Sequence, residues 1–154
     1  MCAPLVQRNG TLIGVAQFLN KLSGPHFTDS DMKLLNLHCS QVAVSIENTS
    51  SRLGASPSME STYDVEETLF RALRILECES IFLLEADHGN GVLFISRAVA
   101  RHASGTKAKA SLTIGPDRKT LPISEGLLGY IMSTGHTVTL VDAHSDPRFT
   151  EAID

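Results

Sequence analysis

The segment from Leu12 to Leu19 is apolar on both faces of an extended strand. Successive side chains of a strand point to opposite sides, so Val15 lies on one face while Ala16 and Phe18 lie on the other. Gln17 is the polar exception on the Val15 face. A strand with two apolar faces needs a layer of structure on each side. We therefore expect a central strand of a sheet that is covered on both faces.

Turn and cap residues delimit the elements around this strand. Arg8-Asn9-Gly10 follows the apolar run Ala3–Gln7. It predicts a hairpin turn, because Asn and Gly both tolerate the positive φ of a tight turn. Thr28 is a candidate N-cap, and Asp31 stands three residues later in the manner of a capping box. The sequence therefore predicts a helix that runs from this cap to about Asn48.

The rest of the chain reads as short strands and helices joined by turns. Residues 50–61 are rich in Ser and indicate a linker. Ser124 is a candidate N-cap and Gly135 a candidate C′ residue of one later helix. The expected helices are Val65–Leu76, Glu125–Ser133 and one that begins at Ser145, and the expected strands are Ser80–Glu85, Val92–Ala100, Ala110–Ile114 and Thr137–Val141.

Composition excludes several function classes. The chain has 154 residues, which favours one domain, and 42% of them are hydrophobic, so it can bury a core. Its formal charge of -4 argues against a nucleic-acid-binding surface. No apolar run is long enough to span a membrane. Cys2, Cys39 and Cys78 lack a paired motif and suggest reduced thiols of a cytoplasmic protein, and we expect Cys2 to be exposed. The six His show no metal spacing, and we expect no metal.

One set of residues resembles a known signature. Asn20, Lys21, Phe27 and Asp31 stand in the order of the Asn-Lys-Phe-Asp-Glu signature of cyclic-nucleotide-binding GAF domains in phosphodiesterases. Met32 stands where that family has Glu. The resemblance implies that these residues brace the pocket rather than contact ligand, with a Lys21–Asp31 pair that holds the loop against the helix start.

The second half of the chain resembles the beginning of the same family. The matching stretches are Leu121-Pro122-Ile123, Gly126-Leu127-Leu128-Gly129 and Val141–Phe149. The resemblance implies that residues 62–154 are the N-terminal part of a GAF domain and residues 1–49 the C-terminal part, joined by the linker 50–61. This permuted order has two explanations: a circular permutation cut at the ligand lid, or a fragment that joins two tandem GAF domains. Together the two parts contain the elements of one GAF-like core.

The resemblance implies an α+β fold of the GAF/PAS type, with an antiparallel sheet, terminal helices on one face and permuted elements. It implies a non-catalytic regulatory domain without a cofactor, which senses cAMP or cGMP and controls a phosphodiesterase or adenylate cyclase output domain. The expected partners are that small-molecule ligand and a second copy, through the terminal helices or through half-domain exchange, but no nucleic acid and no membrane. One alternative is a GAF module that only dimerises, and a weaker one is a redox or sulfoxide-reducing enzyme.

The resemblance also implies where the ligand binds. The Gln17 amide offers a donor and an acceptor to a purine edge, or is satisfied by backbone. Ser80 matches a position near the base, or is an ordinary strand residue. Backbone amides at a helix start favour an anion, and in the family they approach the cyclic phosphate, although the family often has Ala where this chain has Leu128. Thr150 matches the pocket wall and Asp154 the lid. The implied ligand-binding residues are Gln17, Ser80, Leu127, Leu128, Thr150 and Asp154.

Overall fold

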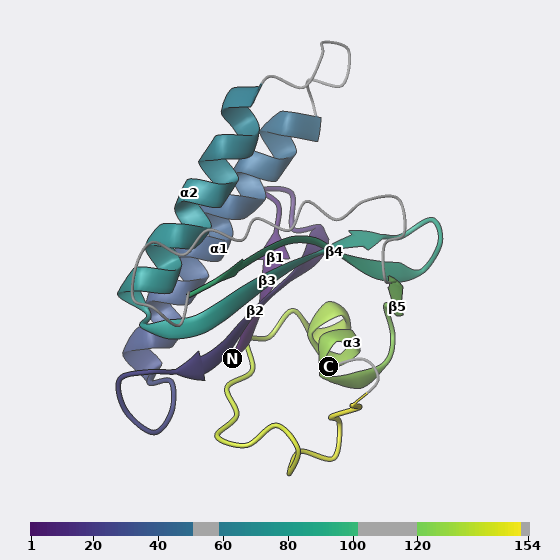
Figure 1. Cartoon of the computed structure of the whole chain (residues 1–154). Coiled ribbons are helices and arrows are strands. Elements are labelled where there is room, and N and C mark those ends of the chain that lie inside the picture. The colour runs from purple at the N-terminus through teal and green to yellow at the C-terminus, as the bar shows by residue number, and fades with distance from the viewer. Residues whose placement is uncertain (51–58, 102–119, 152–154) are drawn as a thin grey trace.

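The computed structural model describes residues 1–50, 59–101 and 120–151. Five strands form one antiparallel sheet in the order β1-β2-β3-β4-β5. Helices α1 and α2 cover one face of the sheet, and α3 lies on the other face (Figure 1). The expected α+β class is confirmed, and the arrangement is consistent with a GAF-like fold. The elements are β1 (Cys2–Val6), β2 (Leu12–Lys21), α1 (Asp29–Ser50), α2 (Met59–Ile75), β3 (Cys78–Asp87), β4 (Val92–Ala100), β5 (Thr120–Pro122) and α3 (Gly126–Thr134).

Strand β2 lies between β1 and β3, and its two faces belong to two separate cores. Ala16 and Phe18 pack with apolar residues of α1 and α2, whereas Val15 packs with residues of α3. These three side chains are at most 2% exposed. The expectation of a strand covered on both faces is therefore confirmed. Burial of apolar surface on both sides therefore ties this interior strand to the layers above and below the sheet.

The pairing of β2 with β3 joins distant parts of the chain. The register runs from Gly14 opposite Glu85 to Lys21 opposite Cys78. Strands from the first 50 residues and strands after residue 77 therefore belong to one sheet. Because each strand pairs with its neighbours in sequence, no crossover connection is needed within the described strands.

The turn between β1 and β2 differs from the prediction in one respect. Gly10 has a positive φ of 87°, whereas Asn9 does not lie in the left-handed region. The N–H of Gly10 donates to the C=O of Gln7, and the N–H of Gln7 donates to the C=O of Thr11, both at 2.9 Å. Asn9 contributes through its side chain, whose Oδ1 accepts the N–H of Thr11 at 2.9 Å. This is a three-residue loop that ends in a left-handed glycine.

Two helix boundaries were predicted wrongly. Helix α2 begins at Met59, before the apolar repeat that starts at Val65 and marks its buried face. Helix α3 has Glu125, not Ser124, as its N-cap. The backbone of Ser124 packs closely against α3. A Cβ added to Gly129 would lie only 2.4 Å from the carbonyl carbon of Ser124. The prediction of Gly135 as the left-handed residue that ends α3 is confirmed, with φ of 69°.

Two elements predicted near the end of the described chain do not form. The segment 137–141 makes only an isolated bridge, between Val138 and Cys2, and then turns away to line a cavity. Turns replace the helix expected from Ser145. There the Asp146 carboxylate accepts the N–H of Arg148 at 2.9 Å, and such local bonds compete with helix formation.

Some predictions concern residues outside the described ranges. They are most of the linker 50–61, the strand Ala110–Ile114 and the ligand residue Asp154.

Gly14 offers a test of the β2–β3 pairing. A Cβ at this position would lie 2.0 Å from the backbone oxygen of Leu84, so the strands must separate to accommodate it. We expect Gly14→Ala to lower the free energy of unfolding by about 2 kcal/mol or more in urea denaturation. In the control variant Gly89→Ala, the Cβ would meet only the side-chain oxygen of Asp87, at 3.3 Å. An equal loss in the two variants would contradict the proposed strand contact.

Candidate functional site

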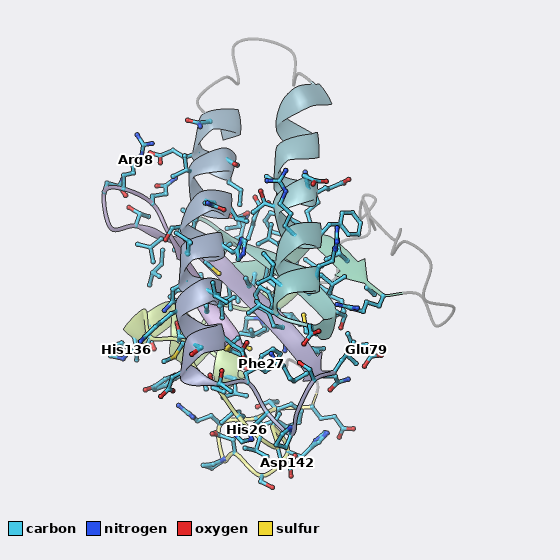
Figure 2. The ribbon with its side chains drawn as sticks, turned by 90° about the vertical axis from the view of Figure 1, so that its left-hand side faces the viewer. Arg8, His26, Phe27, Glu79, His136 and Asp142 are labelled. Atoms are coloured by element: carbon cyan, nitrogen blue, oxygen red, sulfur yellow. The ribbon has the colours of Figure 1, made fainter. Side chains whose placement is uncertain are left out.

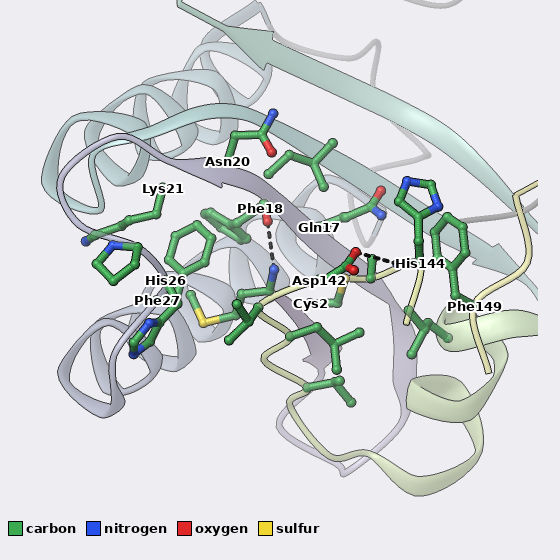
Figure 3. A pocket seen from close by; sticks show the side chains of 18 residues that line it. Cys2, Gln17, Phe18, Asn20, Lys21, His26, Phe27, Asp142, His144 and Phe149 are labelled. Carbon is green, nitrogen blue, oxygen red and sulfur yellow. Dashed lines mark hydrogen bonds between the residues drawn. The ribbon is translucent and has the colours of Figure 1, made fainter. Parts of the chain in front are cut away.

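A cavity of about 490 Å³ opens on the α3 side of the sheet, between the end of β2 and the segment 138–149. Figure 3 shows Lys21, His26 and Phe27 at one end and His144 and Phe149 at the other, with the remaining residues between them. Figure 2 shows that His26 and Asp142 lie at the end of the molecule opposite to Arg8. The polar described residues that line the cavity are Gln17, Asn20, Lys21, His26, Asp142 and His144.

Contacts with the body of the protein hold the segment 138–149 as one wall of the cavity. Cys2 and Val138 exchange two backbone hydrogen bonds, of 2.8 and 2.9 Å. The Arg148 guanidinium lies 4.3 Å from the centre of the Tyr130 ring on α3. Asp146 orients that guanidinium through an ion pair of 2.7 Å. This irregular segment is therefore tied both to β1 and to α3.

Two of the six predicted ligand residues line the cavity. Gln17 reaches it from the α3 face of β2, and Leu127 reaches it from the first turn of α3. A helix N-terminus carries partial positive charge, which favours an anion nearby. The cavity therefore combines an amide side chain with an electropositive helix end.

The structure places three other predicted residues outside the lining. Ser80 lies opposite Leu19 in the β2–β3 register, so it shares the cavity face of the sheet but sits one strand away. Leu128 is 1% exposed and packs in the core beneath α3. Thr150 is exposed and follows Phe149, which does line the cavity.

The signature residues form a clamp between three elements. Lys21 Nζ at the end of β2 lies 2.8 Å from Asp31 Oδ1 on α1, the ion pair that the sequence suggested. The same ammonium donates to the C=O of Leu76 at the end of α2, at 3.0 Å. Asp31 Oδ2 accepts from the N–H and the hydroxyl of Thr28, so the expected capping box is present. A single lysine thus connects β2, α1 and α2.

The other two signature residues extend the clamp. Asn20 has a positive φ of 54°, a conformation that Asn tolerates better than most residues. Its Nδ2 donates to Glu79 Oε2 on β3 at 2.7 Å. Phe27 is 6% exposed, and Lys21 Nζ lies 5.7 Å from the centre of its ring. Three residues of the clamp also line the cavity, so the clamp forms one end of the site itself; they are Asn20, Lys21 and Phe27.

The thiols do not favour redox chemistry. Cys2 is 8% exposed, so the expectation that it is exposed was wrong. Burial raises the pKa of Cys39 to about 12 and the pKa of Cys78 to about 11, which keeps both thiols protonated at neutral pH. Within the described ranges, no group of three or more His, Cys, Asp and Glu side chains is placed to bind a metal ion. None of the described helices has the length and apolarity needed to cross a membrane.

Sequence reasoning missed several residues of the cavity wall. Asp142, His144 and Phe149 belong to a stretch that matched the family, but no role was assigned to them. His144 and Phe149 pack edge to face, with ring centres 4.6 Å apart. Their position depends on the Val138 bridge and on the Arg148 contact, neither of which has a local sequence signal.

The chain is similar over its whole length to cyclic-nucleotide phosphodiesterases. It is 27% identical over 176 residues to the dual 3',5'-cyclic-AMP and -GMP phosphodiesterase 11 of Drosophila melanogaster. It is 28% identical over 180 residues to the dual 3',5'-cyclic-AMP and -GMP phosphodiesterase 11A of Takifugu rubripes. Both alignments cover 100% of this chain, but only 12% and 20% of the respective relatives. No protein-family model and no solved structure matches the chain.

These alignments bear on the order of the elements. Because each runs through the whole chain in a single direction, the relatives carry the matching segments in the same order. The comparison therefore gives no support to a circular permutation.

The clamp predicts a pH-dependent contribution to stability. We expect Asp31→Ala to lower the free energy of unfolding at pH 7 by about 3 kcal/mol, because the largely buried Lys21 ammonium loses its counter-ion. The control is Glu67→Ala, which removes the exposed pair with Arg71 and should cost less than about 1 kcal/mol. Urea denaturation measures both values, and equal losses would contradict a special role for the clamp.

The pH dependence follows from the Asp31 pKa. Burial raises this pKa, but the hydrogen bonds from Lys21 and Thr28 outweigh burial and hold it below its ordinary value of 3.8. The ionised carboxylate therefore stabilises the fold fully at any pH above the pKa that Asp31 has in the unfolded chain. This contribution is lost as the pH falls through the lower pKa of the folded state. The difference between wild type and Asp31→Ala should shrink in acid. A difference that stays constant down to the acid transition of the wild type would contradict this assignment.

Proposed function

We propose that this chain is a regulatory GAF-type domain that binds a cyclic nucleotide, cAMP or cGMP, and controls a phosphodiesterase output domain. The observation that carries the proposal is the cavity bounded by Gln17, the N-terminal turn of α3 and the signature clamp. The named activity of the relatives supports the ligand class. The chain spans too little of those relatives for their catalytic activity to be assigned to it.

The size and polarity of the cavity suit such a ligand. A volume of about 490 Å³ lies within the range of about 300 to 1,000 Å³ that is usual for small-molecule sites. The end of α3 at Leu127 favours the cyclic phosphate. Gln17 offers a donor and an acceptor to the base.

The order of the elements favours the tandem explanation. In this proposal, residues 1–49 end one GAF domain and residues 62–154 begin the next, in the order that the phosphodiesterase relatives share. Within this chain the two parts pair through β2 and β3. The same pairing between two copies would give the half-domain exchange that the sequence suggests.

Coupling to an output domain requires that the ligand favours one helix arrangement. Lys21 lines the cavity and also bonds to Asp31 of α1 and to the C=O of Leu76, directly after α2. A ligand that changes the position of Lys21 therefore changes contacts at the ends of both helices, and differential binding shifts the population of the two arrangements.

Thermal unfolding tests nucleotide binding. At a hundredfold excess over its dissociation constant, a bound nucleotide stabilises the fold by about 2.7 kcal/mol and raises the melting temperature. We expect Gln17→Ala to reduce this shift, while Gln41→Ala, on the exposed side of α1, leaves it unchanged. Absence of a shift with millimolar cAMP and with millimolar cGMP would overturn the proposal.

A second candidate function is a module that only dimerises through α1. Leu34 and Leu37 lie one turn apart on α1 and are 39% and 57% exposed. An apolar pair at this spacing favours helix–helix contact. This function requires no ligand in the cavity.

Sedimentation equilibrium tests the dimer. We expect Leu37→Glu to weaken self-association at least tenfold, because it places a charge in an apolar contact. The matched control is Leu22→Glu, which changes an exposed leucine outside α1. A monomeric wild type, or equal effects of the two substitutions, would contradict dimerisation through α1.

A further inference from the structure

Among the described residues that line the cavity, Asp142 alone carries a carboxylate. Two hydrogen bonds orient its carboxylate: Oδ1 accepts the N–H of His144 at 3.0 Å, and Oδ2 accepts the hydroxyl of Ser145 at 2.6 Å. The same bonds lower its pKa, so the group is ionised at neutral pH. The cavity therefore contains an oriented, negatively charged acceptor.

An ionised carboxylate accepts hydrogen bonds and donates none. It has about four lone-pair sites, so Asp142 keeps acceptor capacity beyond the bonds from His144 and Ser145. A ligand group that meets this side chain must present N–H or O–H donors. An acceptor atom at that place would instead be repelled by the negative charge.

The two purine bases differ in this property. The pairing edge of guanine carries two adjacent donors, at N1 and at the 2-amino group, next to the O6 acceptor. Adenine carries one amino donor next to the N1 acceptor. Gln17 alone pairs with either edge, because its amide both donates and accepts. Asp142 lines the same cavity as that amide. When Gln17 faces position 6 of the base and the carboxylate faces positions 1 and 2, guanine offers the carboxylate two donors, whereas adenine offers it the N1 acceptor.

We propose that Asp142 is a specificity-determining residue that makes this cavity prefer cGMP to cAMP. In this arrangement the Gln17 amide donates to O6 while Asp142 accepts from N1–H and the 2-amino group. The inference rests on the proposed function, since it assigns the base specificity of the same site. The α3 end of the cavity receives the cyclic phosphate, which is common to both nucleotides.

Calorimetric titration of the whole chain with cGMP and with cAMP tests the assignment. We expect wild type to bind cGMP at least about tenfold more tightly, the discrimination typical of a paired base edge. Asp142→Asn keeps an oxygen for the N–H of His144 but loses the charge. It should abolish most of the preference by weakening cGMP binding. Asp29→Asn, which removes an exposed charge from the first turn of α1, should leave the preference unchanged.

A change in the ligand tests the same contact without a variant. Cyclic IMP has the N1–H and O6 of cGMP but lacks the 2-amino group, so wild type should bind it several-fold more weakly than cGMP. Equal binding of cyclic IMP and cGMP, a preference for cAMP, or an unchanged ratio in Asp142→Asn would overturn the assignment. Binding of both nucleotides with no preference would overturn this inference alone. If neither nucleotide binds, the proposed function fails and the specificity assignment fails with it.

Discussion

The pairing of β2 with β3 is the contact on which the rest of the structure depends. It joins strands that are separated by both long helices, and it closes one sheet from two parts of the chain. Because β2 is buried on both faces, this pairing also fixes the layers on either side. Gly14 permits the close approach, since any larger residue would meet the backbone of β3.

The Lys21 clamp connects that sheet to the site. One ammonium bonds to Asp31 and to the end of α2, and its side chain also forms part of the cavity wall. The clamp and the cavity therefore share residues. A ligand at this end of the cavity meets residues that already determine how α1 and α2 sit on the sheet.

The outer wall of the cavity has a different physical origin. The segment from Val138 to Phe149 has almost no regular structure, and a strand bridge and the contact of Arg148 with Tyr130 hold it. Such contacts are made between residues distant in sequence. Asp142 and His144 thereby enter a cavity that neither turn chemistry nor periodicity predicts.

The sequence by itself determined the elements whose cause is local. The two apolar faces of β2, the Thr28 capping box and the left-handed Gly135 each follow from residues within a few positions of one another. The resemblance carried by Asn20, Lys21, Phe27 and Asp31 also implied the Lys21–Asp31 pair. The contacts of Lys21 with Leu76 and of Asn20 with Glu79 join distant residues and were not predicted. Where a local signal competed with another, as at Ser124, Thr137–Val141 and Ser145, the prediction was wrong.

Only the tertiary structure decided which residues share the cavity. It brought Gln17 and Leu127 together, buried Leu128 in the core and set Ser80 one strand away from the lining. It also added Asp142, which the sequence left without a role. The physical reason is that strand register, helix position and the fold-back of the segment 138–149 depend on contacts between distant residues. Periodicity and capping report only on neighbours along the chain.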